Sequence, residues 1–72
     1  MIPLSMVAPG EPAMVGKITG KDAVRQHLAE LGFVVDATVS VVSRVGGSVI
    51  VQVQDSRIAL DAAMANRIFV KS

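Results

Sequence analysis

A chain of 72 residues is long enough for one small domain, and we expect residues 1–72 to form a single domain. It contains no cysteine, which excludes disulfides and thiolate metal sites and makes the cytoplasm the simplest location. Seven Lys and Arg residues against six Asp and Glu residues leave a net charge of +1, too small to indicate a nucleic-acid partner. No apolar run approaches the roughly 18 residues of a membrane-spanning helix, so we expect no insertion into a membrane.

The N-terminal part of the chain predicts two strands joined by a turn. Residues 3–7 have the pattern of a short edge strand that starts at a proline, with Leu4 and Met6 on the same side. Residues 9–12 contain two prolines and a glycine, which are typical of a turn. Residues 13–19 then resume an extended pattern, so we expect them to form a second strand.

A short helix follows, and its sequence indicates both its start and its buried side. Thr19 and Asp22 form a capping-box pattern, in which the hydroxyl accepts a hydrogen bond from a free N–H of the first turn. At about 100° per residue the apolar residues fall on one stripe, which consists of Val24, Leu28 and Leu31. The opposite side carries Arg25 and Gln26, which either contact only water or face a partner.

The sequence also predicts where this helix ends. Gly32 lies where a left-handed backbone conformation is needed, and glycine adopts it without strain. Phe33 can then fold back onto Leu28, the hydrophobic contact that accompanies a Schellman ending. We therefore expect the helix to stop at Gly32 and to lead directly into the β-rich second half of the chain.

The second half begins with a hairpin. Residues 37–45 are extended, with a break in the alternation at Val42 where a twist or bulge is expected. Gly46 and Gly47 favour a two-residue hairpin turn with positive φ at both positions. Residues 48–54 form the returning strand, and its core side is expected to consist of Val49, Val51 and Val53.

Three further elements complete the chain. Residues 55–56 predict a second, weaker turn before a strand over residues 57–60. Residues 61–66 are good helix formers with an aspartate at their start, which predicts one helical or 3₁₀ turn. Residues 67–71 close the chain as a strand.

About five short strands, one inserted α-helix and one short 3₁₀ or helical turn predict a mainly β fold. A small closed or nearly closed barrel suits these elements, because closure leaves no strand edge exposed. Its core must be aliphatic, since Phe33 and Phe69 are the only aromatic residues.

Catalytic and metal sites find little support in the sequence. His27 is the only histidine, and one ligand does not make a metal site. The aspartates fall at expected turns and helix starts, where carboxylates cap backbone N–H groups. The serines lack a Gly-x-Ser-x-Gly context. We therefore expect no enzymatic activity, no metal site within one chain and no cofactor.

Several residues are candidates for contacts with a partner protein. Arg44 and Arg57 flank the hairpin and could bind a carboxylate or phosphate, although an ordinary solvated strand edge is the simpler interpretation. Apolar residues on the outer sides of their strands form either a partner surface or a face that the helix covers; they are Val42, Ile50 and Phe69. The expected partner-binding residues are Arg25, Gln26, Arg44, Arg57 and Phe69.

The predicted helix ends at Leu31-Gly32-Phe33, a Gly46-Gly47 hairpin follows, and Arg57-Ile58-Ala59-Leu60 lies downstream. In this combination the sequence resembles the FeoA family of ferrous iron transport accessory proteins. The residues that carry the resemblance are Leu28, Leu31, Gly32, Phe33, Gly46, Gly47, Ala59 and Leu60. Two turns depart from the family: Val35-Asp36 stands where a Pro-Gly turn is usual, and Asp55-Ser56 lacks the usual nearby glycine.

This resemblance implies an SH3-like barrel with an inserted helix, in a cytoplasmic and non-enzymatic protein. It also implies action on FeoB, a membrane transporter that carries its own GTPase domain. The same module occurs at the end of DtxR-type metal-dependent repressors, so a domain that binds or senses a transition metal is the alternative. Peptide recognition in the manner of eukaryotic SH3 domains is excluded, because it needs an aromatic groove and the sequence has neither Trp nor Tyr.

Overall fold

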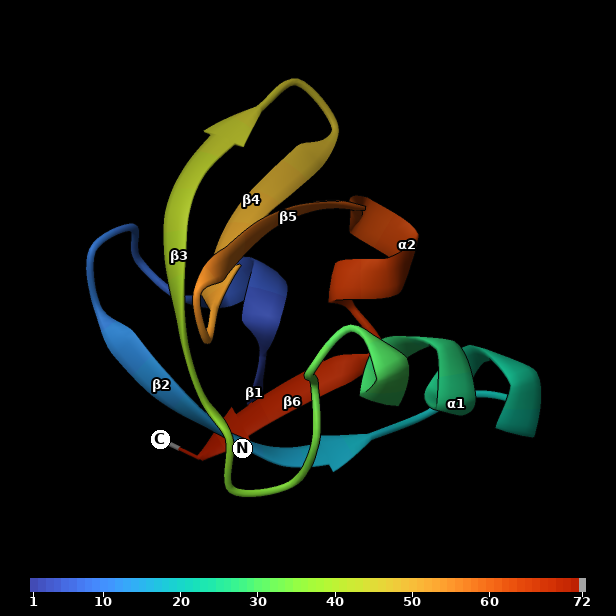
Figure 1. Ribbon diagram of the computed structural model, residues 1–72. Helices are drawn as coiled ribbons and strands as arrows, with labels where there is room; N and C mark the ends of the chain where they lie inside the picture. Colours follow the sequence, from blue (N-terminus) through green and yellow to red (C-terminus); the bar gives the residue numbers. More distant parts are fainter. Residues whose placement is uncertain (72) are drawn as a thin grey trace.

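The computed structural model describes residues 1–71, which form one antiparallel sheet wrapped around a core, with two α-helices packed beside it (Figure 1). The elements in chain order are β1 (Ile2–Pro3), the 3₁₀ helix η1 (Leu4–Met6), β2 (Pro12–Ile18), α1 (Asp22–Glu30), β3 (Thr38–Val45), β4 (Ser48–Val53), β5 (Ser56–Asp61), α2 (Ala62–Ala65) and β6 (Ile68–Lys71). The strand order is β1-β6-β2-β3-β4-β5.

This architecture confirms the prediction of a small, mainly β barrel with a helix inserted after the second strand. Within residues 1–71 the sheet has six strands, and Ile2 and Pro3 pair with β6 as a short strand in place of the one predicted over residues 3–7. In the described part of the chain the sheet is not closed, since β1 and β5 each pair with only one neighbour there. Neither helix within residues 1–71 has the length and hydropathy to cross a membrane.

The core is aliphatic apart from Phe33, as the composition requires. The strands contribute alternate residues, so that Val49, Val51 and Val53 of β4 lie inside with Ile68 and Val70 of β6. The largest completely buried side chains include Phe33, Leu4, Leu28 and Ile68. No polar or charged side chain within residues 1–71 is buried among them. Hydrophobic burial is therefore the main source of stability in this sheet.

The N-terminal segment differs from the prediction of a strand over residues 3–7. After Pro3 the chain turns into η1, whose first residue accepts a hydrogen bond from the Val7 N–H at 3.1 Å. Because a 3₁₀ helix has three residues per turn, Leu4 and Val7 lie on the same side, and both are buried. Met6 is 67% exposed, so the expectation that it shares a side with Leu4 is wrong.

Helix α1 starts later than the capping-box pattern indicated. Lys21 occupies the N-cap without a side-chain hydrogen bond, and Asp22 is the first helical residue. The predicted cap at Thr19 is wrong, because Thr19 extends β2: its backbone N–H donates to the Arg67 carbonyl at 2.8 Å. Its hydroxyl donates to the same carbonyl at 3.4 Å.

The predicted backbone geometry of the helix ending is confirmed. Gly32 has a φ of 108°, its N–H donates to Ala29 at 3.0 Å, and the Phe33 N–H donates to Leu28 at 3.0 Å. This pair of bonds defines a Schellman motif. Phe33 and Leu28 are both completely buried in the core cluster. The corner that they form lies between α1 and β3.

The predicted bulge at Val42 is confirmed, because the pairing of β3 with β4 shifts by one residue between Val41 and Ser43. In the hairpin turn only Gly46 has a positive φ, at 58°, which is the pattern of a type II′ turn. The expectation of a positive φ at Gly47 is therefore wrong.

The turn and the strand that follow β4 begin one residue earlier than predicted, whereas α2 and β6 begin one residue later. The second turn consists of Gln54 and Asp55 instead of residues 55–56, since Ser56 already pairs with Val53. Asp61 caps α2 as expected, accepting a hydrogen bond from the Met64 N–H at 2.8 Å. β6 then pairs between β1 and β2, as the second strand from one edge of the sheet.

Candidate interaction surface

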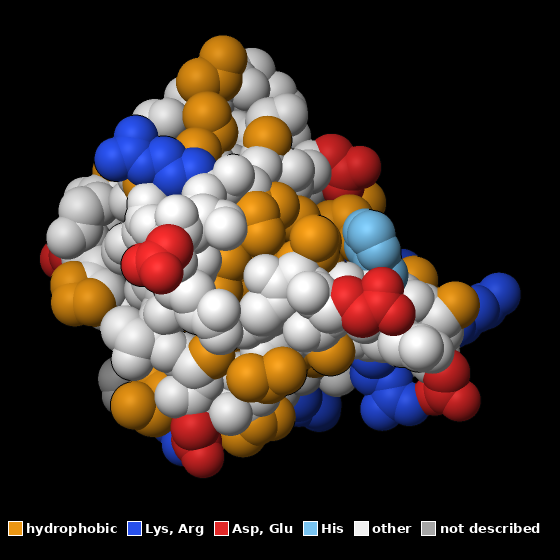
Figure 2. Space-filling model, in the orientation of Figure 1, with side chains coloured by type: hydrophobic (Ala, Val, Ile, Leu, Met, Phe, Trp, Pro, Cys, Tyr) orange, Lys and Arg blue, Asp and Glu red, His pale blue; other side chains and the backbone are white. Residues whose placement is uncertain are grey.

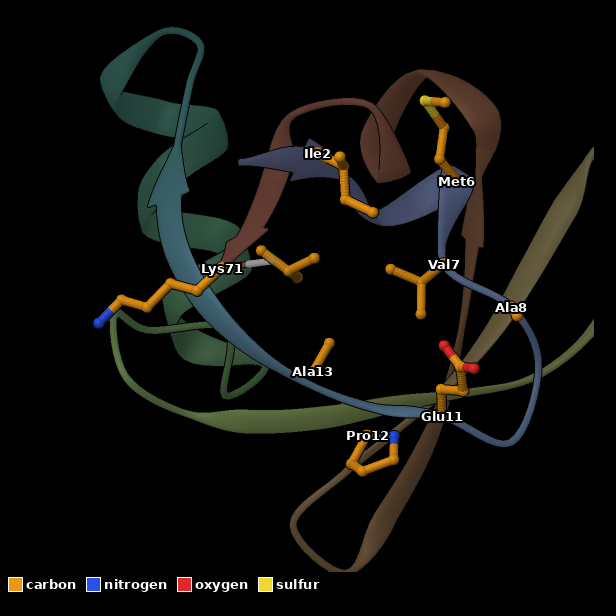
Figure 3. Close-up of a pocket in the computed structure, with 9 residues that line it drawn as sticks. Ile2, Met6, Val7, Ala8, Glu11, Pro12, Ala13 and Lys71 are labelled. Carbon is orange, nitrogen blue, oxygen red and sulfur yellow. The ribbon is translucent and has the colours of Figure 1, made fainter.

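A groove of about 400 Å³ lies between the N-terminal segment, the start of β2 and the end of β6 (Figure 3). β6 borders β2 from Met14 to Ile18, so Pro12 and Ala13 pair with β3 alone within residues 1–71. The groove opens on that free side of β2. Its lining residues are Ile2, Met6, Val7, Ala8, Glu11, Pro12, Ala13, Val70 and Lys71.

Apolar side chains form the wall of this groove, and two opposite charges lie at its rim. In Figure 3, Ile2, Val7 and Ala13 point towards a common space, while Glu11 and Lys71 lie on opposite sides of it. The Lys71 ammonium pairs with Asp36 at 2.6 Å. Glu11 has no ion-pair partner among residues 1–71. The groove thus offers apolar contact and one free carboxylate.

Arg44 holds the chain segment that forms one wall of the groove. Its Nη2 donates to the Ser5 carbonyl at 2.5 Å and to the Val7 carbonyl at 2.6 Å. Hydrogen bonds from a charged donor are stronger than neutral ones. The Gly10 N–H adds a bond of 2.8 Å to the Val41 carbonyl. The predicted partner-binding residue Arg44 therefore has a role within the molecule.

The other predicted partner-binding residues do not gather around the groove. Arg57 lies on the outer face of β5, where its Nε donates to Gln52 Oε1 at 3.1 Å. Arg25 and Gln26 are exposed on α1, and Arg25 pairs with Asp22 of the same helix. Phe69 is half-buried on β6, opposite Pro3 and Lys17 in the register. These residues occupy separate parts of the surface.

The residues that carry the family resemblance have structural positions. Leu28, Phe33 and Leu60 are buried in the core, and Leu31 packs against it. The remaining non-glycine signature residue, Ala59, is exposed on β5. Four of the five non-glycine signature residues are thus buried in the core or packed against it.

Sequence reasoning missed the groove itself. Its wall brings together residues from the N-terminal segment, β2 and β6, which are distant in the chain, so no local pattern indicates them. By contrast, the sequence does contain a feature that indicates the inward position of Arg44. A two-residue turn at Gly46 and Gly47 places Arg44 opposite Val49, which belongs to the core side.

Charges and potential ligands are dispersed over the described surface. On the face shown in Figure 2, basic and acidic side chains lie singly around hydrophobic ones. Within residues 1–71, no three His, Cys, Asp or Glu side chains lie close enough together to hold a metal ion. His27 is exposed on α1.

The comparisons with known proteins agree with this fold. A family model described as the FeoA domain matches residues 2–72. A crystal structure of an iron uptake regulatory protein (FeoA) is 33% identical, with a TM-score of 0.88 over 97% of this chain and 93% of that one. FeoA of Stenotrophomonas maltophilia complexed with zinc, described as a procaryotic SH3 domain protein, is 31% identical, with a TM-score of 0.87 over 99% and 91% of the two chains.

The same fold also occurs in a larger protein of another kind. A manganese-dependent transcriptional repressor shares the fold at 22% identity, with a TM-score of 0.87 over 97% of this chain and 40% of that one. The search of the curated proteins found no significant match. A family match over nearly the whole chain, together with two FeoA structures that are more than 30% identical, shows that the protein belongs to the FeoA family.

Proposed function

We propose that this protein is a non-enzymatic cytoplasmic accessory protein of ferrous iron uptake, which acts by binding the cytosolic part of a FeoB-type transporter. The observation that carries this proposal is the FeoA family match over residues 2–72. One relative is described as an iron uptake regulatory protein, and another as possibly a ferrous iron transport activating factor. Binding to a transporter explains both descriptions without requiring a catalytic centre.

The groove beside the N-terminal segment is the surface that we assign to this contact. Ile2, Val7, Ala13 and Val70 give it an apolar wall, and Glu11 supplies a free charge at the rim. An apolar pocket with a few polar groups around it binds through burial and orients its partner through charge. Arg44 keeps the wall in place before the partner arrives, which reduces the entropy lost on binding.

The experiment compares two exposed apolar residues. Met6 lines the groove and is 67% exposed, whereas Val45 is 63% exposed at the end of β3 and does not line it. In titrations with the cytosolic part of the transporter, we expect Met6→Asp to weaken binding at least about tenfold, because a carboxylate is then desolvated in the interface. Val45→Asp, with the same change of charge, should leave the Kd unchanged.

Three readouts are needed: the Kd, the GTP hydrolysis rate of the transporter domain, and iron uptake. If the protein neither binds that domain nor changes GTP hydrolysis or iron uptake, the proposed function is wrong. If Val45→Asp weakens binding as much as Met6→Asp, the function stands and the groove is the wrong surface.

The second candidate function is binding of a divalent transition metal, which the zinc complex of the S. maltophilia protein favours. In this chain the nearest set of ligands would be His27 with Glu30 on α1, and two ligands on an exposed helix bind zinc weakly. We expect a titration with Zn²⁺ or Fe²⁺ to give no saturable amide shift at these residues. A saturable shift there would instead support a metal-binding protein.

A further inference from the structure

The two edges of the sheet differ in how well they are protected. β1 is only two residues long and contains Pro3, and short edge strands with proline resist pairing with another chain. β5 has six residues without glycine or proline, and it pairs with β4 in an unbroken register from Ser56 to Asp61. No further strand covers its second edge within residues 1–71. β5 is therefore an edge that can accept another strand.

The hairpin turns indicate which backbone groups point to this edge. A two-residue turn connects Val53 to Ser56, so these two residues form a hydrogen-bonded pair. The N–H and C=O groups of successive residues point to opposite sides of a strand. The backbone groups of Ile58 and Leu60 therefore also point to β4, like those of Ser56. The backbone groups of Arg57 and Ala59 and the N–H of Asp61 point to the open edge. No loop or helix backbone within residues 1–71 bonds to Arg57 or Ala59.

Along this edge, one basic and one acidic side chain lie at equal distances in the sequence from a central alanine. Arg57 and Asp61 lie two residues on either side of Ala59, and all three are exposed. They share the outer face of the sheet, where Ala59 lies opposite Ile50 and Arg57 lies opposite Gln52. In an antiparallel strand pair with its two-fold axis at Ala59, each Arg57 comes to lie opposite Asp61 of the other strand.

We propose that β5 pairs with β5 of a second copy of this chain, in antiparallel orientation around a two-fold axis at Ala59. The contact is isologous, because the same edge serves both copies. The two Ala59 residues exchange N–H and C=O bonds, and each Asp61 N–H donates to Arg57 of the other copy, giving about four backbone hydrogen bonds. For Asp61 only the N–H is counted, because Asp61 is the N-cap of α2 and its carbonyl accepts a hydrogen bond within that helix.

Side chains extend this pairing on the outer face. Ile50 is half-buried and lies outside the core cluster, next to Ala59. Across the axis, the two Ala59 side chains and the two Ile50 side chains form an apolar strip, with an Arg57–Asp61 pair at each end. Asp61 keeps one carboxylate oxygen for its cap at Met64, which leaves the other for the arginine. Charge complementarity thus selects this register over one shifted by two residues.

The test measures association by sedimentation equilibrium, at protein concentrations up to about 1 mM because the interface is small. Arg57→Asp places two aspartates opposite each other at both ends, and Asp61→Lys places two cations there. We expect each variant alone to lose dimerisation. Mixed together, the two variants restore opposite charges at both ends, and we expect a heterodimer. Lys17→Asp, an exposed charge reversal on β2, is the control and should leave dimerisation unchanged.

Ala59→Pro provides an independent test of the backbone pairing. It removes an N–H that points away from β4, so the monomer keeps its sheet while the second copy loses a donor and meets the proline ring. We expect the variant to fold, as judged by its thermal unfolding, and to remain monomeric. Asp61→Lys loses its cap, but a folding defect cannot explain recovery of association in the mixture.

Three results would overturn the proposal: a wild-type chain that is monomeric at all concentrations, a dimer that survives Ala59→Pro, or charge variants that fail to combine. A monomer whose β5 edge binds an extended peptide of another protein would assign the edge to a different occupant and also reject the second copy. Because the groove lies on another part of the molecule, Met6→Asp should not change dimerisation. Failure of the dimer is thus distinguishable from failure of the proposed function.

Discussion

Within residues 1–71, two residues other than glycine have a left-handed backbone: Asp36 with a φ of 73° and Gln54 with a φ of 53°. They lie in or next to the two turns where the sequence differs from what the family resemblance implies. At both positions a residue with a Cβ adopts a conformation that costs roughly 1–2 kcal/mol. Aspartate tolerates this region better than glutamine does. The strain is therefore expected to be larger at Gln54.

Introducing a glycine at position 54 and removing the glycine at position 32 should change the free energy of unfolding in opposite directions. Gln54→Gly should raise the free energy of unfolding by about 1 kcal/mol, because it removes the strain at φ 53°. Gly32→Ala should lower it by at least about 1 kcal/mol, since the φ is 108° and a Cβ would lie 3.0 Å from Val53 Cγ2. Urea denaturation measures both. Gly47→Ala is the control, because its Cβ would meet nothing within 4 Å; a loss of stability in Gln54→Gly would refute the strain.

Within β3, a single bulge decides the role of Arg44. Without the shift between Val41 and Ser43, Arg44 would lie on the outer side of the strand with Ser40. With the shift, it lies opposite Val49 on the core side and reaches the carbonyls of the N-terminal segment. One irregularity in a strand thus converts a surface cation into the anchor of another element.

Removing this anchor should loosen the N-terminal segment before it unfolds the sheet. In Arg44→Gln, we expect the amides of Val7 and Gly10 to exchange about 5–30-fold faster, which corresponds to the loss of about 1–2 kcal/mol of charge-assisted hydrogen bonding. Hydrogen exchange followed by NMR measures this rate. Arg57→Gln removes a cation from β5 without touching the segment, so the same two amides should keep their rates. Equal acceleration in both variants would contradict an anchoring role.

At the scale of the whole molecule, the sequence predicted the parts of the fold that local patterns determine. Alternation identified β4 through Val49, Val51 and Val53, and the Schellman corner at Gly32 and Phe33 was found from four residues. The 3₁₀ turn at residues 4–6 was missed, because one turn of three residues has no periodicity. The groove was missed for a different reason: its wall forms only after β6 and the N-terminal segment meet β2.

The Arg44 contact also bears on the order in which the molecule assembles. It joins residues 39 and 37 positions apart in the chain, whereas the β3–β4 and β4–β5 hairpins close through two-residue turns. Closing the longer loops costs more entropy, so this contact is expected to form after the transition state for folding. In stopped-flow experiments, Arg44→Gln should speed unfolding and leave the folding rate nearly unchanged, a φ-value close to zero. The lifetime of the native groove, rather than the speed of its formation, is then the property that Arg44 controls.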